Sequence, residues 1–501
     1  MGLATVASRA RLGLAAPPVS VEVHLSGGLP GFSIVGLPEA AVRESKDRVK
    51  AALMSSRFDY PQSRIIVNLA PAELPKDGGR FDLPIALGIL AASGQLPVRP
   101  LAGREFVGEL SLDGHLRPVS GVLSAAVAAT TAGRSLIVPA GNEQEAALVE
   151  GLDGHAACDL LGVCAHLRGT RALPGLVRTA RVRRPSGPDL ADVRGQPAAR
   201  RALEIAAAGG HDLLLIGPPG TGKTMLAVRL IGLLPELADD EALEIAVIGS
   251  VADGRFEPGD WRRRPFRQPH HTASAPALTG GGARPRPGEI TRAHHGVLFL
   301  DELPEFPRAA LEALREPLER RAITVARASG SVSFPADFQL VAAMNPCPCG
   351  FVGDPERSCR CSPELIARYR ARVSGPLLDR LDLQVSVPRP PAATVLSRDS
   401  TGEASAEVAR RVDAARRRQH ARGWLNARLP VDGLFDACDA GAGAMGLLEA
   451  AAARFHFSAR ACHRVLRVAR TIADLGGAPR VARTEVSEAL GLRLLDRGGP
   501  H

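Results

Sequence analysis

The feature that most constrains this 501-residue chain is the octapeptide GPPGTGKT at residues 217–224. A short apolar run at 213–216 precedes it and a segment typical of a helix follows, which is the strand–loop–helix setting of a phosphate-binding loop. Its glycines let the backbone turn N–H groups onto phosphate oxygens, and the helix N-terminus adds a favourable dipole. The octapeptide therefore predicts a nucleotide site on a parallel α/β sheet, because a plain glycine-rich turn does not explain this setting.

The loop also contains the residue types that ATP and Mg²⁺ require. We expect Lys223 to reach the β- and γ-phosphates and the Thr224 hydroxyl to bind Mg²⁺. Lys223 is the only lysine after position 76, in a chain that carries most of its positive charge as arginine. The expected nucleotide-binding residues are Gly217, Pro218, Pro219, Gly220, Thr221, Gly222, Lys223, Thr224 and Asp301.

Two further apolar runs end in polar residues that suit phosphoryl transfer. The run at 296–300 ends in Asp301 and Glu302, at the strand end where open α/β sheets bind ligands. We expect Asp301 to join the magnesium site and Glu302 to activate the attacking water, although an acidic helix N-cap fits the same letters. The run at 338–343 leads to Asn345, whose amide is expected to orient the water beside the γ-phosphate.

Arginines towards the C-terminus are candidates for contacts with the γ-phosphate. Arg380 stands between two aspartates, so it is either an arginine finger for a neighbouring chain's site or an arginine that those aspartates neutralise. Arg460 and Arg464 fall on one face of an amphipathic helix that follows a serine N-cap. Either of them is a candidate for phosphate, and the alternative is a solvated basic face.

Four of the eight cysteines lie within fifteen residues, in the pattern C-x-C-x₉-C-x-C. Cys347, Cys349, Cys359 and Cys361 would close a tetrahedral zinc site, and a metal there would fix the end of the strand that leads to Asn345. A reduced, metal-free cluster is the alternative. A disulfide framework is not expected, because eight cysteines are few for a chain of 501 residues that we expect to be cytoplasmic.

Two basic segments suit a polyanionic partner, in keeping with a net charge of +9. The first, 254–295, is rich in arginine and holds Trp261, Phe266 and two pairs of adjacent histidines. The second, 320–338, is expected to form a hairpin around Ser329 with Arg327 near its tip. Both are expected to contact nucleic acid phosphates, or else to be exposed basic surface. Adjacent histidines are expected to point apart, which disfavours a metal site.

The chain divides by composition into three structured parts. Residues 1–166 read as an α/β unit, 167–188 as a linker, 189–390 as a second α/β unit, and 405–501 as helices. In the first unit we expect a helix at 38–56, a strand at 64–71, an apolar helix at 82–94 and a hairpin at 106–119. Since no run approaches the roughly 18 apolar residues of a membrane span, we expect a cytoplasmic protein without membrane contact.

Taken together, GPPGTGKT, VLFLDE, AAMNPCPCG, PLLDRLDL and SARACHRVLRVARTIADL resemble the magnesium-chelatase-like branch of the AAA+ ATPases. The segment that begins GLPGFSIVGLPEAAVRESKDRVKAAL is similar to the bacterial ComM (YifB) family. The resemblance implies a homo-oligomeric, hexameric ring that uses ATP to promote branch migration on branched or single-stranded DNA, with pore-facing basic loops. It also implies that Asn345 is sensor 1, Arg380 the trans arginine finger and Arg460 sensor 2, with Arg464 less favoured.

The N-terminal unit resembles the Lon protease domain, but without its catalytic dyad. Lon places its serine soon after P-x-D-G, whereas PKDG at 75–78 is followed by Gly79, Arg80 and Phe81. Lon's lysine should follow GELSLDGHLRPVSG, where VLSAA stands instead. Peptidase activity is therefore not expected, and a DNA-facing or ring-forming role is.

Three functions compete at this point. The first is a DNA-translocating AAA+ motor, with a helical C-terminal lid of the magnesium-chelatase type. The second is an ATPase subunit that inserts magnesium into a porphyrin, and the third is an ATP-switched chaperone or scaffold. Stimulation of ATP hydrolysis by DNA separates the first from the other two.

Overall fold

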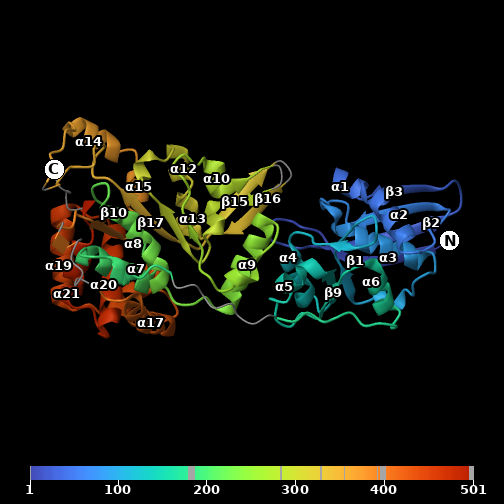
Figure 1. The fold of residues 1–501 in the computed structure, drawn as a ribbon. Helices are drawn as coiled ribbons and strands as arrows, with labels where there is room; N and C mark the ends of the chain where they lie inside the picture. The colour runs from blue at the N-terminus through green and yellow to red at the C-terminus, as the bar shows by residue number, and fades with distance from the viewer. Residues whose placement is uncertain are drawn as a thin grey trace.

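A seven-stranded mixed sheet forms the N-terminal unit, in the order β3-β4-β2-β1-β5-β8-β9 (Figure 1). The computed structural model describes residues 2–178, 187–282, 285–327, 330–354, 356–391, 393–394 and 402–495. Strands β1, β2 and β4 pair antiparallel, whereas β5, β8 and β9 continue the sheet in parallel. The strands are β1 (Gly2–Arg9), β2 (Pro18–Ser26), β3 (Gly31–Val35), β4 (Arg64–Ala70), β5 (Arg104–Phe106), β8 (Ser135–Pro139) and β9 (Gly154–Ala157).

Helix α3 (Asp82–Ala92) packs on β1 and β2 and is buried along almost its whole length. The predicted strand at 64–71 and the predicted hairpin are confirmed, the hairpin as β6 (Glu109–Leu110) and β7 (Leu116–Arg117). The prediction of one helix over 38–56 is wrong, because the chain forms α1 (Ala40–Arg43) and α2 (Ser45–Ser55) with a break between them. Pro38 does not lie in a first helical turn; it forms a β-bridge with Lys76.

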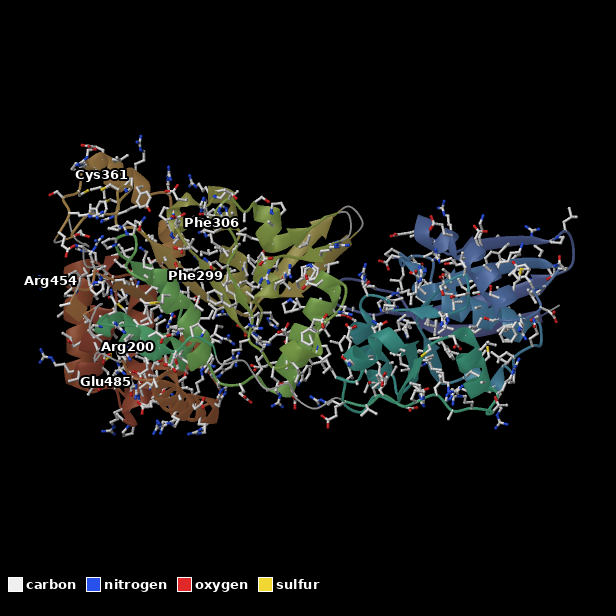
Figure 2. The ribbon with its side chains drawn as sticks, viewed as in Figure 1. Arg200, Phe299, Phe306, Cys361, Arg454 and Glu485 are labelled. Carbon is white, nitrogen blue, oxygen red and sulfur yellow. The ribbon has the colours of Figure 1, made fainter. Side chains whose placement is uncertain are left out.

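A five-stranded, wholly parallel sheet forms the centre of the second unit, in the order β11-β14-β17-β10-β18. It consists of β10 (Leu213–Ile216), β11 (Phe266–Arg267), β14 (Val297–Leu300), β17 (Gln339–Met344) and β18 (Leu383–Ser386). Leu213 pairs with both Val341 and Leu383, so β10 lies in the middle and the carboxyl ends of these strands meet at one edge. This is the predicted parallel α/β sheet of an AAA+ core, and Phe299 of β14 is buried inside it (Figure 2).

Helices form the C-terminal part and pack against α7 (Pro197–Gly209) (Figure 1). Their bounds are α17 (Ser405–Ala421), α18 (Val431–Cys438), α19 (Ala442–Phe455), α20 (Ala459–Gly476) and α21 (Arg483–Gly491). Ser458 caps α20 as expected, because its side chain accepts the Ala461 N–H. All five helices lie within 405–501, the stretch that the sequence analysis predicts to be helical. Over the described residues, no helix has both the length and the apolar character that a membrane span needs.

Among the described residues, the N-terminal unit contacts the second unit through α4 (Val122–Thr131) and through the loop between β1 and β2. Helix α9 (Asp239–Asp253) packs on α4, and Ala246 and Phe256 join the apolar core beneath α4. The Ser250 hydroxyl donates a hydrogen bond to the buried Glu145 carboxylate, whose pKa burial raises. The loop between β1 and β2 lies against β16, with Gly13 close to Val332. The N-terminal unit therefore contacts the elements next to both basic segments.

Candidate nucleotide site

The Lys223 ammonium lies inside the phosphate loop. It donates hydrogen bonds to the carbonyl oxygens of Gly217 (2.7 Å) and Pro218 (2.8 Å), and to Oδ1 of Asn345 (3.1 Å). Burial lowers the pKa of Lys223, against the opposing charges of Asp301 and Glu302. All three partners of the ammonium are neutral oxygens, which the oxygens of a bound phosphate could replace. The structure therefore brings Lys223 and Asn345 to one site.

The backbone of the loop favours glycine at several positions, of which Gly217 and Gly222 show the two reasons. A Cβ at Gly217 would lie 2.1 Å from the carbonyl oxygen of Val387, which is too close for any side chain. Gly222 has φ 86° and precedes α8 (Lys223–Arg229) in the left-handed region that favours glycine. Close packing against Val387 at one position and the left-handed backbone at the other therefore explain why the loop carries glycine there.

Thr224 and Asp301, which the sequence predicts to bind magnesium, lie in contact with each other. Thr224 Oγ1 donates a 2.7 Å hydrogen bond to Oδ2 of Asp301, which directly follows β14. Hydroxyl and carboxylate oxygens are the hard donors that Mg²⁺ prefers, and Mg²⁺ in such sites is held by one or two protein oxygens and by phosphates. The two residues therefore fit a magnesium ion bound together with ATP.

Glu302 adopts a left-handed backbone conformation, with φ 55° and ψ 45°. Such a conformation costs a non-glycine residue about 1–2 kcal/mol, and strain of this kind gathers at functional sites. The Glu302 N–H donates to Oδ1 of Asp301 (3.0 Å), and its side chain makes no helix-capping hydrogen bond. Glu302 thus occupies the N-cap position of the 3₁₀ helix η7 (Leu303–Glu305), but its carboxylate does not cap that helix. His271 Nδ1 lies 3.0 Å from the Glu302 carboxylate, a contact that the sequence analysis missed.

Arg380 and Arg460 meet at a carboxylate that the sequence analysis did not select, Glu319 of α13 (Arg315–Arg320). Arg380 is buried and pairs with Glu319, and Arg460 Nη2 lies 3.7 Å from the same Glu319 oxygen. The suggested neutralisation of Arg380 by its flanking aspartates is not what the structure shows. The two arginines that the resemblance nominates therefore lie together, one buried and one exposed.

Arg464 belongs to a buried network instead. Its Nη1 donates to Oδ1 of Asp382 (2.6 Å) and to the carbonyl oxygen of Arg380 (2.6 Å). Asp382 also contacts His211 Nδ1 (3.0 Å), whose Nε2 lies 2.7 Å from the Thr471 hydroxyl. Burial alone would raise the pKa of Asp382, but Arg464 and His211 outweigh it and hold that pKa well below its usual range. Arg464 therefore has a structural partner, which supports the preference for Arg460.

The four clustered cysteines face one another. The Sγ atoms of Cys347, Cys349 and Cys359 are 3.4–3.6 Å apart, and those of all four cysteines lie within 4.8 Å of one another. A tetrahedral zinc with Zn–S bonds of about 2.3 Å places its sulfurs about 3.8 Å apart, so the donors fit zinc. The cluster also contacts the nucleotide site, because a Cβ at Gly350 would lie 2.6 Å from Cδ of Pro219 in the phosphate loop.

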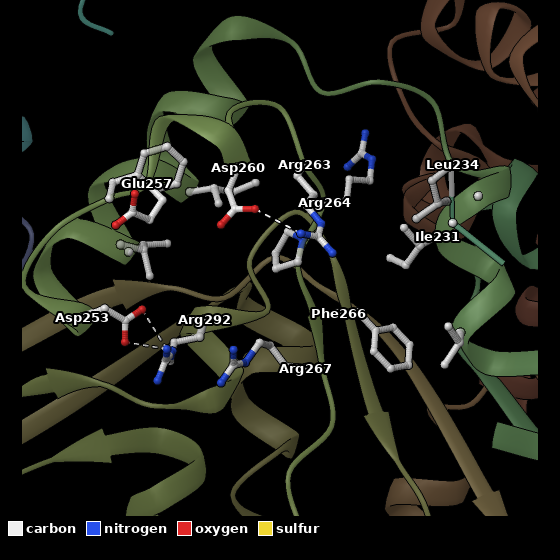
Figure 3. A pocket seen from close by; sticks show the side chains of 18 of the residues that line it. Ile231, Leu234, Asp253, Glu257, Asp260, Arg263, Arg264, Phe266, Arg267 and Arg292 are labelled. Atoms are coloured by element: carbon white, nitrogen blue, oxygen red, sulfur yellow. Dashed lines mark hydrogen bonds and ion pairs between the residues drawn. The ribbon is translucent and has the colours of Figure 1, made fainter. Parts of the chain in front are cut away.

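The arginines of the 254–295 segment are largely neutralised within the structure. Several of them line a cavity of about 920 Å³. In this cavity Arg292 pairs with Asp253 (2.7 Å) and Arg263 with Asp260 (3.1 Å), as the dashed lines in Figure 3 mark. The cavity is lined by Val228 and Ile231, at the end of α8 away from the phosphate loop, and is therefore separate from the nucleotide site. Arg327 ends β15 (Ala322–Arg327), which pairs with β16 (Gly330–Pro335); its side chain and the turn at Ser329 lie outside the described residues.

The expectation that adjacent histidines point apart is wrong at 294–295. Both Nε2 atoms lie 2.8 Å from Oε2 of Glu244. The Asp337 N–H donates to Nδ1 of His294 (3.0 Å), so a neutral His294 carries its proton on Nε2 and donates it to Glu244. No lone pair of that ring then faces Glu244, so the cluster is a hydrogen-bonded clamp rather than a metal site.

In the N-terminal unit, Arg80 lies where the resemblance to Lon looks for a serine. It is buried, its guanidinium donates to the carbonyl oxygens of Arg9 (3.3 Å) and Ser120, and burial lowers its pKa to about 10. The resemblance to Lon would place the catalytic lysine after Gly121. In this chain α4 begins there, with the buried apolar residues Val122 and Leu123. Arg80 therefore binds backbone carbonyl oxygens where Lon has its serine, and Val122 and Leu123 pack in the core where Lon has its lysine.

Comparison with known proteins agrees with this architecture. Residues 189–395 match the family model for magnesium chelatase subunit ChlI, 21–142 a second model for subunit ChlI of Mg-chelatase, and 402–493 the C-terminal model of that subunit. These matches and the parallel sheet with its phosphate loop define an AAA+ ATPase of the magnesium-chelatase-like class.

Two full-length relatives narrow the class. The chain is 50% identical to the YifB protein of Escherichia coli K12 over 499 residues, which are 99% of this chain and 98% of the relative. It is also 50% identical to the competence protein ComM of Haemophilus influenzae over 505 residues, with the same coverage. The chain therefore belongs to the ComM/YifB family. A stretch of 174 residues, 30% of this chain and 32% of the relative, is 26% identical to Lon protease 2 of Bacillus subtilis.

Proposed function

We propose that this protein hydrolyses ATP and uses the energy to move DNA, as a hexameric ring that promotes branch migration in recombination and natural transformation. The carrying observation is the assembled site, in which Lys223 contacts Asn345 and Thr224 contacts Asp301 across three strands of one sheet. Membership in the AAA+ family and the name of the Haemophilus relative, a competence protein, support the proposal.

Each residue of the site has a proposed role. Lys223 binds the β- and γ-phosphates, while Thr224 and Asp301 hold the Mg²⁺ that comes with the nucleotide. Glu302 accepts the proton of the attacking water, and Asn345 orients that water as sensor 1. Magnesium neutralises charge on the phosphates during the reaction.

Two arginines complete the site from the neighbouring subunit or from the lid. Arg380 is the trans arginine finger, and Arg460, which shares Glu319 with it, is sensor 2. Both must leave Glu319 to reach a phosphate, and a γ-phosphate offers a stronger acceptor for an arginine than a single carboxylate shared by two. Because Arg380 of one subunit would act at the phosphate loop of the next, hydrolysis would depend on assembly of the ring.

We also propose that Cys347, Cys349, Cys359 and Cys361 bind one structural zinc. The contact of Gly350 with Pro219 supports a role for this zinc in holding the phosphate loop and the strand end at Asn345.

The test of the DNA activity is an ATPase titration with branched, single-stranded and no DNA at two salt concentrations. We expect DNA to accelerate hydrolysis, with an affinity that falls steeply as salt rises, because phosphate contacts release counterions. Replacing Arg327 should lower the DNA-stimulated rate more than the basal rate, whereas replacing Lys223 should abolish both. Failure of DNA to bind or to accelerate hydrolysis at low salt would contradict the proposal.

The family models bear the description of a magnesium chelatase subunit, which favours a second candidate function. An ATPase subunit of that kind inserts magnesium into a porphyrin and has no need of DNA. ATP hydrolysis that is indifferent to every DNA tested would favour this candidate.

A further inference from the structure

The cysteine cluster combines reactive side chains with an accessible position. Cys347 is buried, whereas Cys349, Cys359 and Cys361 are only half-buried. Cys361 lies at an outer corner of the molecule, beside α14 (Pro363–Arg370) (Figure 2). Solvent, and a small oxidant dissolved in it, therefore approaches three of the four side chains.

The other four cysteines of the chain have a different environment. Burial raises the pKa of Cys164 to about 12 and that of Cys438 to about 11, so both thiols stay protonated and unreactive. Cys158 is exposed and Cys462 half-buried, but neither belongs to the group of four sulfurs that lie within 4.8 Å of one another. An oxidised thiol in the cluster, by contrast, has a second thiol beside it.

The sulfur atoms of the cluster are close enough to pair after a small movement. The Sγ atom of Cys347 lies 3.4 Å from that of Cys349 and 3.6 Å from that of Cys359, and the last two are 3.5 Å apart. A disulfide bond is about 2.05 Å long, so its formation brings two sulfurs together by about 1.5 Å. A bound zinc would instead keep the sulfurs about 3.8 Å apart. The oxidised and the reduced cluster therefore require different backbone positions.

A tight turn carries such a movement to the phosphate loop. The Gly350 N–H donates a hydrogen bond to the carbonyl oxygen of Cys347 (3.0 Å), and this turn includes Cys349. The turn packs directly on the phosphate loop, because a Cβ at Gly350 would lie 2.6 Å from Cδ of Pro219. Cys347 also follows Asn345 by two residues. A change in the turn therefore acts on the phosphate loop and on the residue proposed as sensor 1.

The loop between the two C-x-C pairs is shaped by contacts within itself. The Arg357 guanidinium lies 5.2 Å from the centre of the Phe351 ring, and Oδ1 of Asp354 accepts the N–H groups of Glu356 (2.8 Å) and Arg357 (3.0 Å). One contact with the rest of the core is a loose ion pair, 3.9 Å long, between Asp354 and Arg389. Such a loop is able to rearrange when the cysteines pair.

We propose that the cysteine cluster is a thiol switch, in which a peroxide oxidises these cysteines to disulfides and thereby weakens ATP binding. The inference rests on the proposed function, because it takes residues 217–224 as the ATP site. It deepens that function by naming a regulation of this site, exerted through the contact between Gly350 and Pro219.

The oxidation proceeds in two steps. A cluster thiolate attacks one oxygen of the peroxide, the O–O bond breaks, and a sulfenic acid forms while hydroxide leaves. A neighbouring thiolate then attacks the sulfenic sulfur, the S–S bond forms, and a second hydroxide leaves. The two sulfurs thus give two electrons to one hydrogen peroxide, which takes up two protons and becomes two waters. A zinc ion held by these thiolates departs as the hydrated ion.

The experiment treats the reduced full chain with hydrogen peroxide and stops the reaction with catalase. We expect disulfides between cluster cysteines in the tryptic peptides, and release of any bound zinc to a chromogenic chelator. The affinity for a fluorescent ATP analogue should fall about 10- to 100-fold, as displacement of a site by about an ångström does. A thiol reductant together with zinc should restore the affinity.

The matched control is the double variant Cys158→Ser, Cys462→Ser, which lacks two cysteines outside the cluster and should respond to peroxide as wild type does. Cluster disulfides that leave the ATP affinity unchanged would overturn the inference, as would a loss of affinity without cluster disulfides or a cluster that peroxide leaves reduced. Reduced protein that neither binds nor hydrolyses ATP would instead contradict the proposed function. Reduced protein without zinc would contradict the zinc proposal alone, so these failures are distinguishable.

Discussion

The side-chain oxygen of Asn345 lies 3.1 Å from the Lys223 ammonium, although 122 residues separate them in the chain. The contact exists because β10 and β17 are parallel neighbours, so the residues that follow them leave the sheet at the same edge. It ties the residue expected to hold the γ-phosphate to the residue expected to sense it. The nucleotide site is thus assembled by strand order rather than by local sequence.

Lys223 and Asn345 should therefore affect different steps of one reaction. Lys223→Ala should weaken ATP binding and abolish turnover, because it removes the buried cation of the loop. Asn345→Ala should bind ATP with little change and lose about 10- to 1,000-fold in kcat, since a water-orienting group acts mainly in the transition state. Equilibrium binding of a fluorescent ATP analogue and steady-state ATPase rates measure the two effects. An Asn345→Ala enzyme with a normal kcat would show that this amide has no role in hydrolysis.

Arg380 should act in the site of a neighbouring chain. Arg380→Ala and Glu302→Gln rings should each be inactive, and a mixture should recover hydrolysis where an intact Arg380 meets an intact Glu302. In an equal mixture that exchanges freely, about a quarter of the interfaces in a cyclic ring meet this condition. The control is a mixture of Arg380→Ala with the double variant Arg380→Ala, Glu302→Gln, in which no interface combines an intact Arg380 with an intact Glu302. No recovery in rings shown to exchange subunits would contradict action in trans.

The strands and the phosphate loop follow from sequence, whereas partners that meet only in space do not. The run at 213–216 predicts β10 because its apolar residues are continuous and a glycine loop follows. Strand β1 was missed because its buried positions include Ala4 and Ser8, small residues that give little hydrophobic contrast. Glu319 and His271 were missed for a different reason: no local pattern tells a glutamate on a helix, or a histidine in a loop, which distant residue it will face.

The cysteine cluster should hold about one zinc per chain. Metal analysis of protein purified without chelator should show it, and the double variant Cys347→Ser, Cys359→Ser should lose it. Because Gly350 contacts Pro219, loss of the metal should also weaken ATP binding. The double variant Cys158→Ser, Cys462→Ser, which changes cysteines outside the cluster, is the control. Metal-free wild-type protein with full ATPase activity would rule out a structural zinc.

Arg464 and Arg460 should differ in stability as well as in activity. Arg464→Ala leaves the buried Asp382 without its main cationic partner, which typically costs about 3–5 kcal/mol of the free energy of unfolding. Arg460→Ala removes a half-exposed side chain and should cost less than about 1 kcal/mol while lowering ATP turnover. Urea unfolding followed by tryptophan fluorescence and circular dichroism measures the difference. Equal stability of the two variants would contradict the assignment of Arg464 to the buried network.

Asp212 should make the folded state less stable as the pH rises. Burial raises the pKa of this carboxyl to about 7, and the nearby Asp382 adds to the rise while Arg321 opposes it. Between the unfolded value near 4 and the folded value, the native state binds one more proton than the unfolded state. The free energy of unfolding therefore falls across that window and levels off above pH 7.

Asp212→Asn tests this directly, because an asparagine is always neutral. Its Oδ1 can still accept the hydrogen bond that the Leu340 N–H donates to Oδ1 of Asp212 at 2.7 Å. The variant should be more stable than wild type at pH 8, and its advantage should shrink by roughly 2 kcal/mol at pH 5, as the wild-type carboxyl becomes protonated. Urea midpoints at several pH values give the difference, with Asp240→Asn on the exposed start of α9 as the control. A difference between Asp212→Asn and wild type that stays constant from pH 5 to pH 8 would show that Asp212 is ionised in the folded protein throughout this range. In that case Arg321 and the Leu340 N–H would outweigh the burial of the carboxylate.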